Sequence, residues 1–135
     1  MGLDNGVRIM SNVRKITREM LPKELSYVWE DSNEDDLEIV YWRKNWGLRN
    51  EVVRTFSHSE DNDYEYYLDT VDDVFKLIRI IVSFMNKEKW DNEGSSIWEY
   101  EEVISMLQND IINLCIIAAF MKNNPDIYLI FYDSY

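Results

Sequence analysis

The fold class of this protein is decided by residues 111–132, whose sequence is IINLCIIAAFMKNNPDIYLIFY. The first half of this stretch is apolar on nearly every side, which is typical of a helix that lies centrally in a domain or in a dimer. Asn123, Asn124 and Pro125 end this helix. The apolar and aromatic run over residues 127–132 then predicts a strand. Hydrophobic helices mixed with strands favour a sheet that is covered by helices.

Hydrophobic periodicity predicts the other elements on either side of this segment. Helices are expected over residues 11–21, 45–56 and 71–87, and another runs from a capping box at Ser96 and Glu99 to residue 122. Strands are expected over residues 3–9, 37–42 and 64–68, and a turn over residues 90–95. We therefore predict one α+β domain, residues 1–135, with a small antiparallel or mixed sheet packed with about four helices. Two of these helices, both in the C-terminal half, are expected to be long and hydrophobic.

The composition is typical of a globular protein with a substantial core. The chain has 135 residues, of which 46% are hydrophobic and 14% aromatic. Its 1 Cys, Cys115, excludes a disulfide within the chain and indicates a reducing compartment. No signal peptide is expected, and the longest apolar stretch, residues 111–121, is shorter than the ~20 residues of a membrane span. We therefore expect a cytoplasmic protein that does not enter a membrane.

The charge of the chain is strongly negative and unevenly distributed. The formal net charge is −12, with 9 basic and 10 acidic residues in residues 1–54 but 5 and 16 in residues 55–135. Such a balance argues against a conventional nucleic-acid binder or a binder of anionic membranes. Any basic patch must come mainly from the first half of the chain.

Motifs for catalysis or metal binding are not found in the sequence. One His and one Cys cannot supply a zinc site, and no glycine-rich phosphate loop or nucleophile elbow is present. His58 lies between Ser57 and Ser59, but neighbours in sequence rarely face each other as a catalytic triad must. We therefore expect a binding protein without catalytic residues, metal or cofactor.

A run of aromatic and basic residues is the strongest candidate for a ligand site. It consists of Tyr41, Trp42, Arg43, Lys44 and Asn45, and Arg49 follows on the next helix. Arginine offers a planar fork for phosphate, tyrosine and tryptophan can stack on a base, and a helix N-terminus adds donors for an anion. These residue types could form a nucleotide site. The ordinary alternative is that Trp42 belongs to the core and that the basic residues pair with the acids of residues 30–38.

Clusters of acidic residues offer a second candidate surface. The residues concerned are Glu60, Asp61, Asp63, Asp72, Asp73, Glu101 and Glu102. Acids on helices could imitate the phosphates of duplex DNA and thereby bind a basic protein. The alternative is a surface charge that only keeps the protein soluble.

The segments Met-Gly-Leu-Asp at residues 1–4 and Tyr-Trp-Arg-Lys at residues 41–44 resemble a family of small, uncharacterised phage and bacterial proteins. Members of this family often have a Met-Tyr-Leu-like continuation where this chain has Asn5, Gly6 and Val7. They also often have a histidine shortly after Tyr-Trp-Arg-Lys, where this chain has Arg49. The resemblance implies a phage or prophage setting and brings no established activity.

Three hypotheses follow for the function. The first is a non-enzymatic inhibitor of bacterial antiviral defence that sequesters a nucleotide second messenger in the host cytoplasm. Its wide apolar helices would favour a homo-oligomer with sites between subunits. The alternative is an acidic, DNA-mimic-like inhibitor of a basic host defence protein, such as a nuclease or a CRISPR effector. The third is an enzyme that acts on a nucleotide.

Overall fold

The computed structural model describes residues 4–26, 28–30, 37–56, 65–94 and 98–134. Within these residues the chain forms one antiparallel sheet of five strands, in the order β2-β3-β1-β5-β4, and four α-helices. The strands are β1 (Asp4–Ser11), β2 (Trp29–Glu30), β3 (Leu37–Arg43), β4 (Glu65–Leu68) and β5 (Ile127–Ser134). The helices are α1 (Trp46–Phe56), α2 (Val71–Ser83), α3 (Lys87–Glu93) and α4 (Tyr100–Asn123). The predicted α+β class is confirmed, and the sheet is antiparallel rather than mixed.

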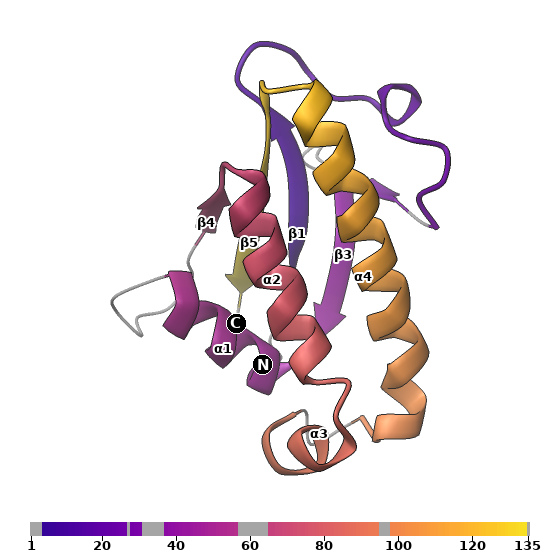
Figure 1. Ribbon diagram of the computed structural model, residues 1–135, viewed down its shortest axis with the longest axis vertical. Helices are drawn as coiled ribbons and strands as arrows, with labels where there is room; N and C mark the ends of the chain where they lie inside the picture. The colour runs from indigo at the N-terminus through magenta and orange to yellow at the C-terminus, as the bar shows by residue number, and fades with distance from the viewer. Residues whose placement is uncertain (1–3, 27, 31–36, 57–64, 95–97, 135) are drawn as a thin grey trace.

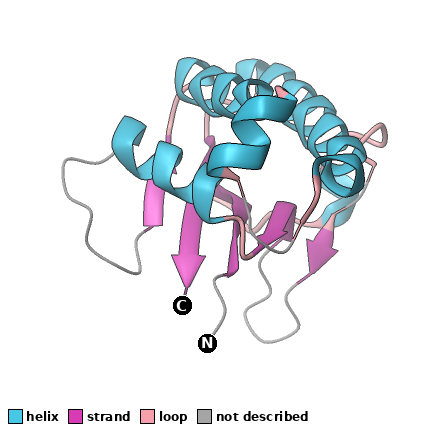
Figure 2. Cartoon of the chain, turned by 90° about the horizontal axis from the view of Figure 1, so that it is seen from below, coloured by secondary structure: helices cyan, strands magenta, loops and turns pink. Residues whose placement is uncertain are grey.

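The helices lie together on one side of the sheet (Figure 2). The central strand β1 pairs with β5 from Asp4 to Ser11 and with β3 from Asp4 to Ile9, with a bulge after Val7. Successive side chains of a strand point to opposite faces, so each strand contributes alternate residues to the side that the helices cover. The opposite face carries no helix of the described residues.

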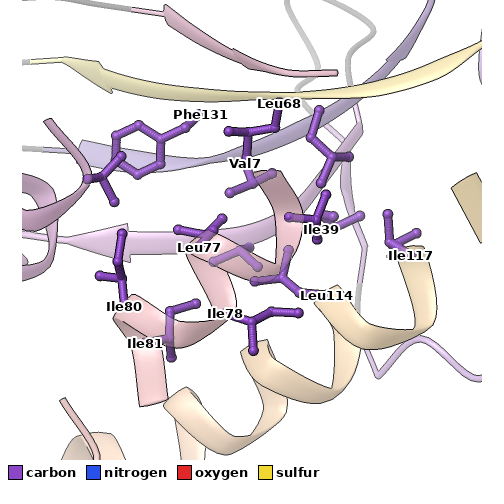
Figure 3. Packing of buried hydrophobic residues seen from close by; sticks show 14 of the residues in the cluster. Val7, Ile39, Leu68, Leu77, Ile78, Ile80, Ile81, Leu114, Ile117 and Phe131 are labelled. Carbon is purple, nitrogen blue, oxygen red and sulfur yellow. The ribbon is translucent and has the colours of Figure 1, made fainter. Parts of the chain in front are cut away.

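The core fills the space between the sheet and the pair α2–α4. Val7 and Phe131 of the sheet lie in one buried cluster with Leu77 of α2 and with Leu114 and Ile117 of α4 (Figure 3). All five side chains have 0% exposed surface. Burying a side chain of this size contributes about 1.5–3 kcal/mol, so this layer stabilises the fold substantially.

The predicted helix over residues 11–21 is wrong. Only a short 3-10 turn, Arg18–Met20, forms there, and Val13 is 77% exposed. The Ser11 hydroxyl donates to Asp126 Oδ2 at 2.6 Å, and Arg14 Nε donates to the same oxygen at 2.8 Å. These contacts with the loop before β5 hold the segment in a non-helical path, although its local pattern fits a helix.

Only one of the two long hydrophobic helices occurs in the described part of the chain. α4 has 24 residues, whereas the segment predicted over residues 71–87 is split into α2, with 13 residues, and the start of α3. Asn86 causes the split, because its side chain caps α3 by accepting a hydrogen bond from the Lys89 N–H at 3.0 Å. Residues 90–93, predicted as a turn, therefore belong to α3.

The N-terminus of α4 also differs from the prediction. Its N-cap is Glu99, and Ser96 of the expected capping box lies outside the described residues. By length and composition alone, α4 would be able to cross a membrane, and it is the single described helix with this property. In this fold α4 packs along α2 and over β3.

Candidate functional site

Trp42 lies in the core, on the face of β3 that the helices cover. Its side chain is 2% exposed, its ring centroid is 6.3 Å from that of Phe131, and its indole N–H donates to Asp110 Oδ2 at 2.8 Å. A buried indole whose N–H is already bonded has no open face for a base. Trp42 therefore belongs to the core, which is the alternative that the sequence left open for this residue.

Arg49 and Asn45 are also buried, with 6% and 2% of their surface exposed. Arg49 Nε donates to Asp133 Oδ2 of β5 at 2.7 Å. The Asn45 side chain accepts a hydrogen bond from the Leu48 N–H at 3.4 Å, at the start of α1. Arg49 thus attaches α1 to β5, and Asn45 caps the start of α1. Their predicted contacts with a ligand stay untested, and their burial does not favour them.

Tyr41, Arg43 and Lys44 remain at the surface or partly exposed. The Tyr41 hydroxyl donates to Asp4 Oδ1 at 2.8 Å, and burial together with this bond raises the pKa of Tyr41 to about 12. Lys44 has a left-handed backbone, with a φ of 55°. Because Tyr41 and Trp42 are successive residues of a strand, they point to opposite faces of the sheet. The six predicted residues are therefore divided between two faces.

The acidic residues do not form one surface either. Asp72 and Asp73 lie in the first turn of α2, and Glu101 and Glu102 in the first turn of α4. The two helices are antiparallel, so these turns lie at opposite ends of the helix pair (Figure 1). Glu60, Asp61 and Asp63 lie outside the described residues. In the first turn of a helix an acid also interacts favourably with the helix dipole, which explains Asp72 and Glu101 without a partner.

The face of the sheet that no described helix covers carries four tyrosines, of which only Tyr41 is among the residues predicted to bind a ligand. The pairings Gly6↔Tyr41, Gly6↔Tyr132, Met10↔Tyr128 and Tyr67↔Ile130 place Tyr41, Tyr67, Tyr128 and Tyr132 on this face. Gly6 is required beneath them, because a Cβ atom there would lie 2.5 Å from Val40 O and 3.2 Å from the Tyr132 ring. We call this group, together with Arg8, the tyrosine face.

Arg8 shows how the tyrosine face accommodates a cation. Its guanidinium carbon lies 4.2 Å from the centroid of the Tyr132 ring. Its Nε is 3.6 Å from Glu38 Oε1, and its Nη1 is 3.9 Å from Glu65 Oε1. Burial, and then the hydrogen bond and negative charge of Glu38, raise the pKa of the Tyr132 hydroxyl. The arrangement combines an aromatic ring with two carboxylates around one cation.

An aromatic pair on the same face, Tyr67 and Tyr128, borders an open cavity of about 520 Å³. The rings of Tyr67 and Tyr128 are 5.8 Å apart and inclined by 44°. Asp69 is exposed, whereas Asp126 binds Ser11 and Arg14, and the Ser11 hydrogen bond in particular lowers the pKa of that carboxyl. The cavity is lined by Asn12, Tyr67, Asp69, Pro125, Asp126, Ile127 and Tyr128. We call it the edge cavity.

The edge cavity presents aromatic rings and one exposed carboxylate, that of Asp69. Aromatic rings and a carboxylate attract a guanidinium or an ammonium group. The described residues contain no group of three or more His, Cys, Asp or Glu side chains able to hold a metal ion. A signal for the tyrosine face was present in the sequence, since Tyr128 and Tyr132 have the alternating spacing of one strand face. The sequence did not indicate that this face is left uncovered by the helices of the described residues.

Comparisons with known proteins found no match to this chain. No family model matches the chain, no curated protein matches its sequence, and no solved structure matches it. The resemblance to small phage and bacterial proteins therefore stays a prediction.

Proposed function

We propose that this protein is a non-enzymatic inhibitor that binds a basic partner protein, and that the edge cavity receives a cationic side chain of this partner. The observation that supports the proposal is the environment of Arg8. An arginine of the chain itself lies over Tyr132 at 4.2 Å, beside the carboxylates of Glu38 and Glu65. The edge cavity offers the same chemical groups, Tyr67, Tyr128 and Asp69, to a side chain from outside.

The composition of the tyrosine face fits a protein partner. Tyrosine is enriched at protein interfaces because it contributes a large contact area with little loss of conformational entropy. Tyr67 is 55% exposed, and four tyrosines share a face that carries no described helix. A partner that docks there would bury aromatic surface and place its cationic side chain in the edge cavity.

The net charge of −12 supports a basic partner. A strongly acidic protein attracts basic proteins at long range and raises their association rate, and salt screens this attraction. The resemblance of residues 1–4 and 41–44 to small phage and bacterial proteins suggests the setting. In that setting the partner would be a host defence protein, such as a nuclease or a CRISPR effector, and the inhibitor would act in the host cytoplasm.

The test uses a fluorescein-labelled hexa-arginine peptide as the probe and fluorescence anisotropy as the readout. Tyr67→Leu keeps an apolar side chain but removes the ring, so we expect the Kd of the peptide to rise about two- to fivefold. Phe75→Leu, which removes an exposed ring from α2, is the matched control and is expected to leave the Kd unchanged.

A second pair of variants separates the edge cavity from the general acidity of the protein. Asp69→Asn and Asp72→Asn remove the same charge from neighbouring exposed positions, but only Asp69 lines the edge cavity. We expect the larger loss of affinity for Asp69→Asn. Equal effects of the two variants, or of Tyr67→Leu and Phe75→Leu, would mean unspecific electrostatic binding and would refute the assigned site.

Sequestration of a nucleotide second messenger is the second candidate function. It is favoured by the exposed Arg43 and the half-exposed Tyr41, which are two residues apart on β3 and therefore share a face. Thermal-shift assays with cyclic di- and trinucleotides test it, because a ligand that binds only the folded protein raises its stability. A shift that disappears in Arg43→Ala while the compound stays intact would support sequestration, and conversion of the compound would indicate an enzyme.

A further inference from the structure

One side of α4 carries a regular seam of exposed residues. Their spacing alternates between three and four residues, which keeps a seam on one side of a helix in a coiled coil. Every position of the seam is exposed, and Ile112, at its middle, is 51% exposed. The seam consists of Glu101, Ser105, Gln108, Ile112, Cys115, Ala119 and Lys122.

This seam is uncharged except at its two ends. From residue 103 to residue 121 the sequence contains one charged residue, Asp110, which is 1% exposed and bonded to the Trp42 indole. Charged residues make up 30% of the whole chain. The uncharged stretch spans about five turns of α4, or roughly 28 Å. Two copies with a net charge of −12 would repel each other less at such a surface than at an acidic one.

The two ends of the seam carry opposite charges. Glu101 lies in the first turn of α4 and Lys122 in the last turn, and both are exposed. If two α4 helices meet in antiparallel orientation about a two-fold axis at Ile112, Glu101 of each copy lies opposite Lys122 of the other. The same axis places Ser105 opposite Ala119 and Gln108 opposite Cys115. A parallel arrangement would instead bring Glu101 against Glu101.

We propose that the seam of α4 is the interface of a homodimer in which the two α4 helices pack antiparallel. The seam is complementary to itself, as a two-fold interface requires. Its small side chains, Ser105, Cys115 and Ala119, allow a close approach of the helices, and Ile112 packs against its counterpart on the axis. Phe75 and Val82 are exposed apolar residues of α2, the helix that packs along α4. This interface is independent of the edge cavity and of its ligand.

The decisive test is a disulfide that only the proposed dimer can form. Gln108→Cys places a thiol opposite the native Cys115 of the second copy, so mild oxidation is expected to give a covalent dimer. Within one helix these positions are seven residues, or about 10.5 Å, apart, which exceeds the reach of a disulfide. Glu88→Cys, on exposed α3, is the control and should not cross-link. Failure of Gln108→Cys to cross-link above this control would overturn the proposed register.

The oligomeric state gives an independent measurement, by analytical ultracentrifugation of the full chain. Ile112→Asp places two carboxylates on the axis, so we expect the dimer Kd to rise at least about tenfold. Val13→Asp, at a more exposed apolar position outside α4, should leave the Kd unchanged. Glu101→Lys and Lys122→Glu should each weaken the dimer, and the double variant should restore it.

Two outcomes would overturn the proposal. One is a wild-type protein that stays monomeric at every concentration measured. The other is a protein that binds neutral phosphatidylcholine vesicles through α4 instead of a second copy. In that case Ile112→Asp would abolish vesicle binding and leave the molecular mass of the protein in solution unchanged. Restoration of the dimer by the charge-swapped double variant would support the antiparallel arrangement specifically.

Discussion

Replacement of Arg49 by methionine is expected to destabilise the protein strongly. Arg49 Nε and Asp133 Oδ2 are 2.7 Å apart, and the two side chains are 8% and 0% exposed. Methionine fills the space of the aliphatic part of the side chain but leaves the Asp133 carboxylate buried without its guanidinium. Loss of one partner of a buried ion pair costs about 3–5 kcal/mol. A domain of this kind has a total stability of about 5–15 kcal/mol, so the effect is a large fraction of it.

Urea denaturation followed by tryptophan fluorescence measures this change, because Trp42 and Trp90 are buried. With a dependence on urea of about 1–3 kcal/mol per molar, a loss of ~3 kcal/mol lowers the midpoint by about 1–3 M. Arg54→Met is the matched control on the same helix. Arg54 forms an exposed pair with Glu51 at 2.8 Å, and such a pair contributes only about 0.3–0.5 kcal/mol.

The double variant Arg49→Met/Asp133→Val separates the buried charge from the lost packing. Since it leaves no unpaired charge, it is expected to be more stable than Arg49→Met alone. A loss of less than about 1 kcal/mol in Arg49→Met, or a double variant less stable than that single variant, would refute the structural role of the pair. A folded Arg49→Met protein of unchanged stability would also return Arg49 to the candidates for ligand binding.

Three further predictions concern single positions. Gly47→Ala should destabilise the protein by about 1–3 kcal/mol in thermal unfolding, because the added Cβ would lie 1.7 Å from Glu93 O, whereas helix propensity alone predicts stabilisation. The pKa of Tyr41 is about 12 in the folded protein against an ordinary 10.0, so the folded state favours the protonated hydroxyl. Its contribution to the free energy of unfolding is therefore fully present below pH 10 and is lost as the pH rises through 12. Alkaline urea titrations should show this loss, and Tyr41→Phe should abolish its share of it. Thr70→Ala should cost about 1 kcal/mol in the urea assay, because Thr70 Oγ1 accepts the Asp73 N–H at 3.2 Å as the N-cap of α2, and an unchanged midpoint would contradict this role.

Much of the secondary structure was predictable from local sequence patterns. The strand predicted over residues 37–42 is β3, and the helix predicted over residues 45–56 is α1. The apolar run of residues 111–121 lies within α4, and Asn124 ends this helix. Periodicity and capping depend on residues close in sequence, so they are visible without the fold. The same kind of pattern failed for residues 11–21, where Asp126 of a distant loop binds Ser11 and Arg14.

The candidate ligand site of residues 41–49 illustrates the limit for function. The sequence showed aromatic and basic residues next to each other, and the alternation of β3 implied that Tyr41 and Trp42 point to opposite faces. It did not show which face the helices cover. Trp42 lies on the covered face, Arg49 is paired with Asp133, and Tyr41 remains on the open face.

The sequence by itself thus determined the α+β class, the positions of most strands and helices, and the strong negative charge. Only the tertiary structure decided the strand order β2-β3-β1-β5-β4, the face of the sheet that stays open, and the assembly of the edge cavity from β4, β5 and the loops beside them. The physical reason is the range of the interactions. Backbone preferences and amphipathic periods are set within a few residues. Strand pairing, buried ion pairs and the covering of a sheet instead join segments that are distant in sequence. The Arg49–Asp133 pair joins residues 84 positions apart. The pairing of β1 with β5 joins residues more than 100 positions apart.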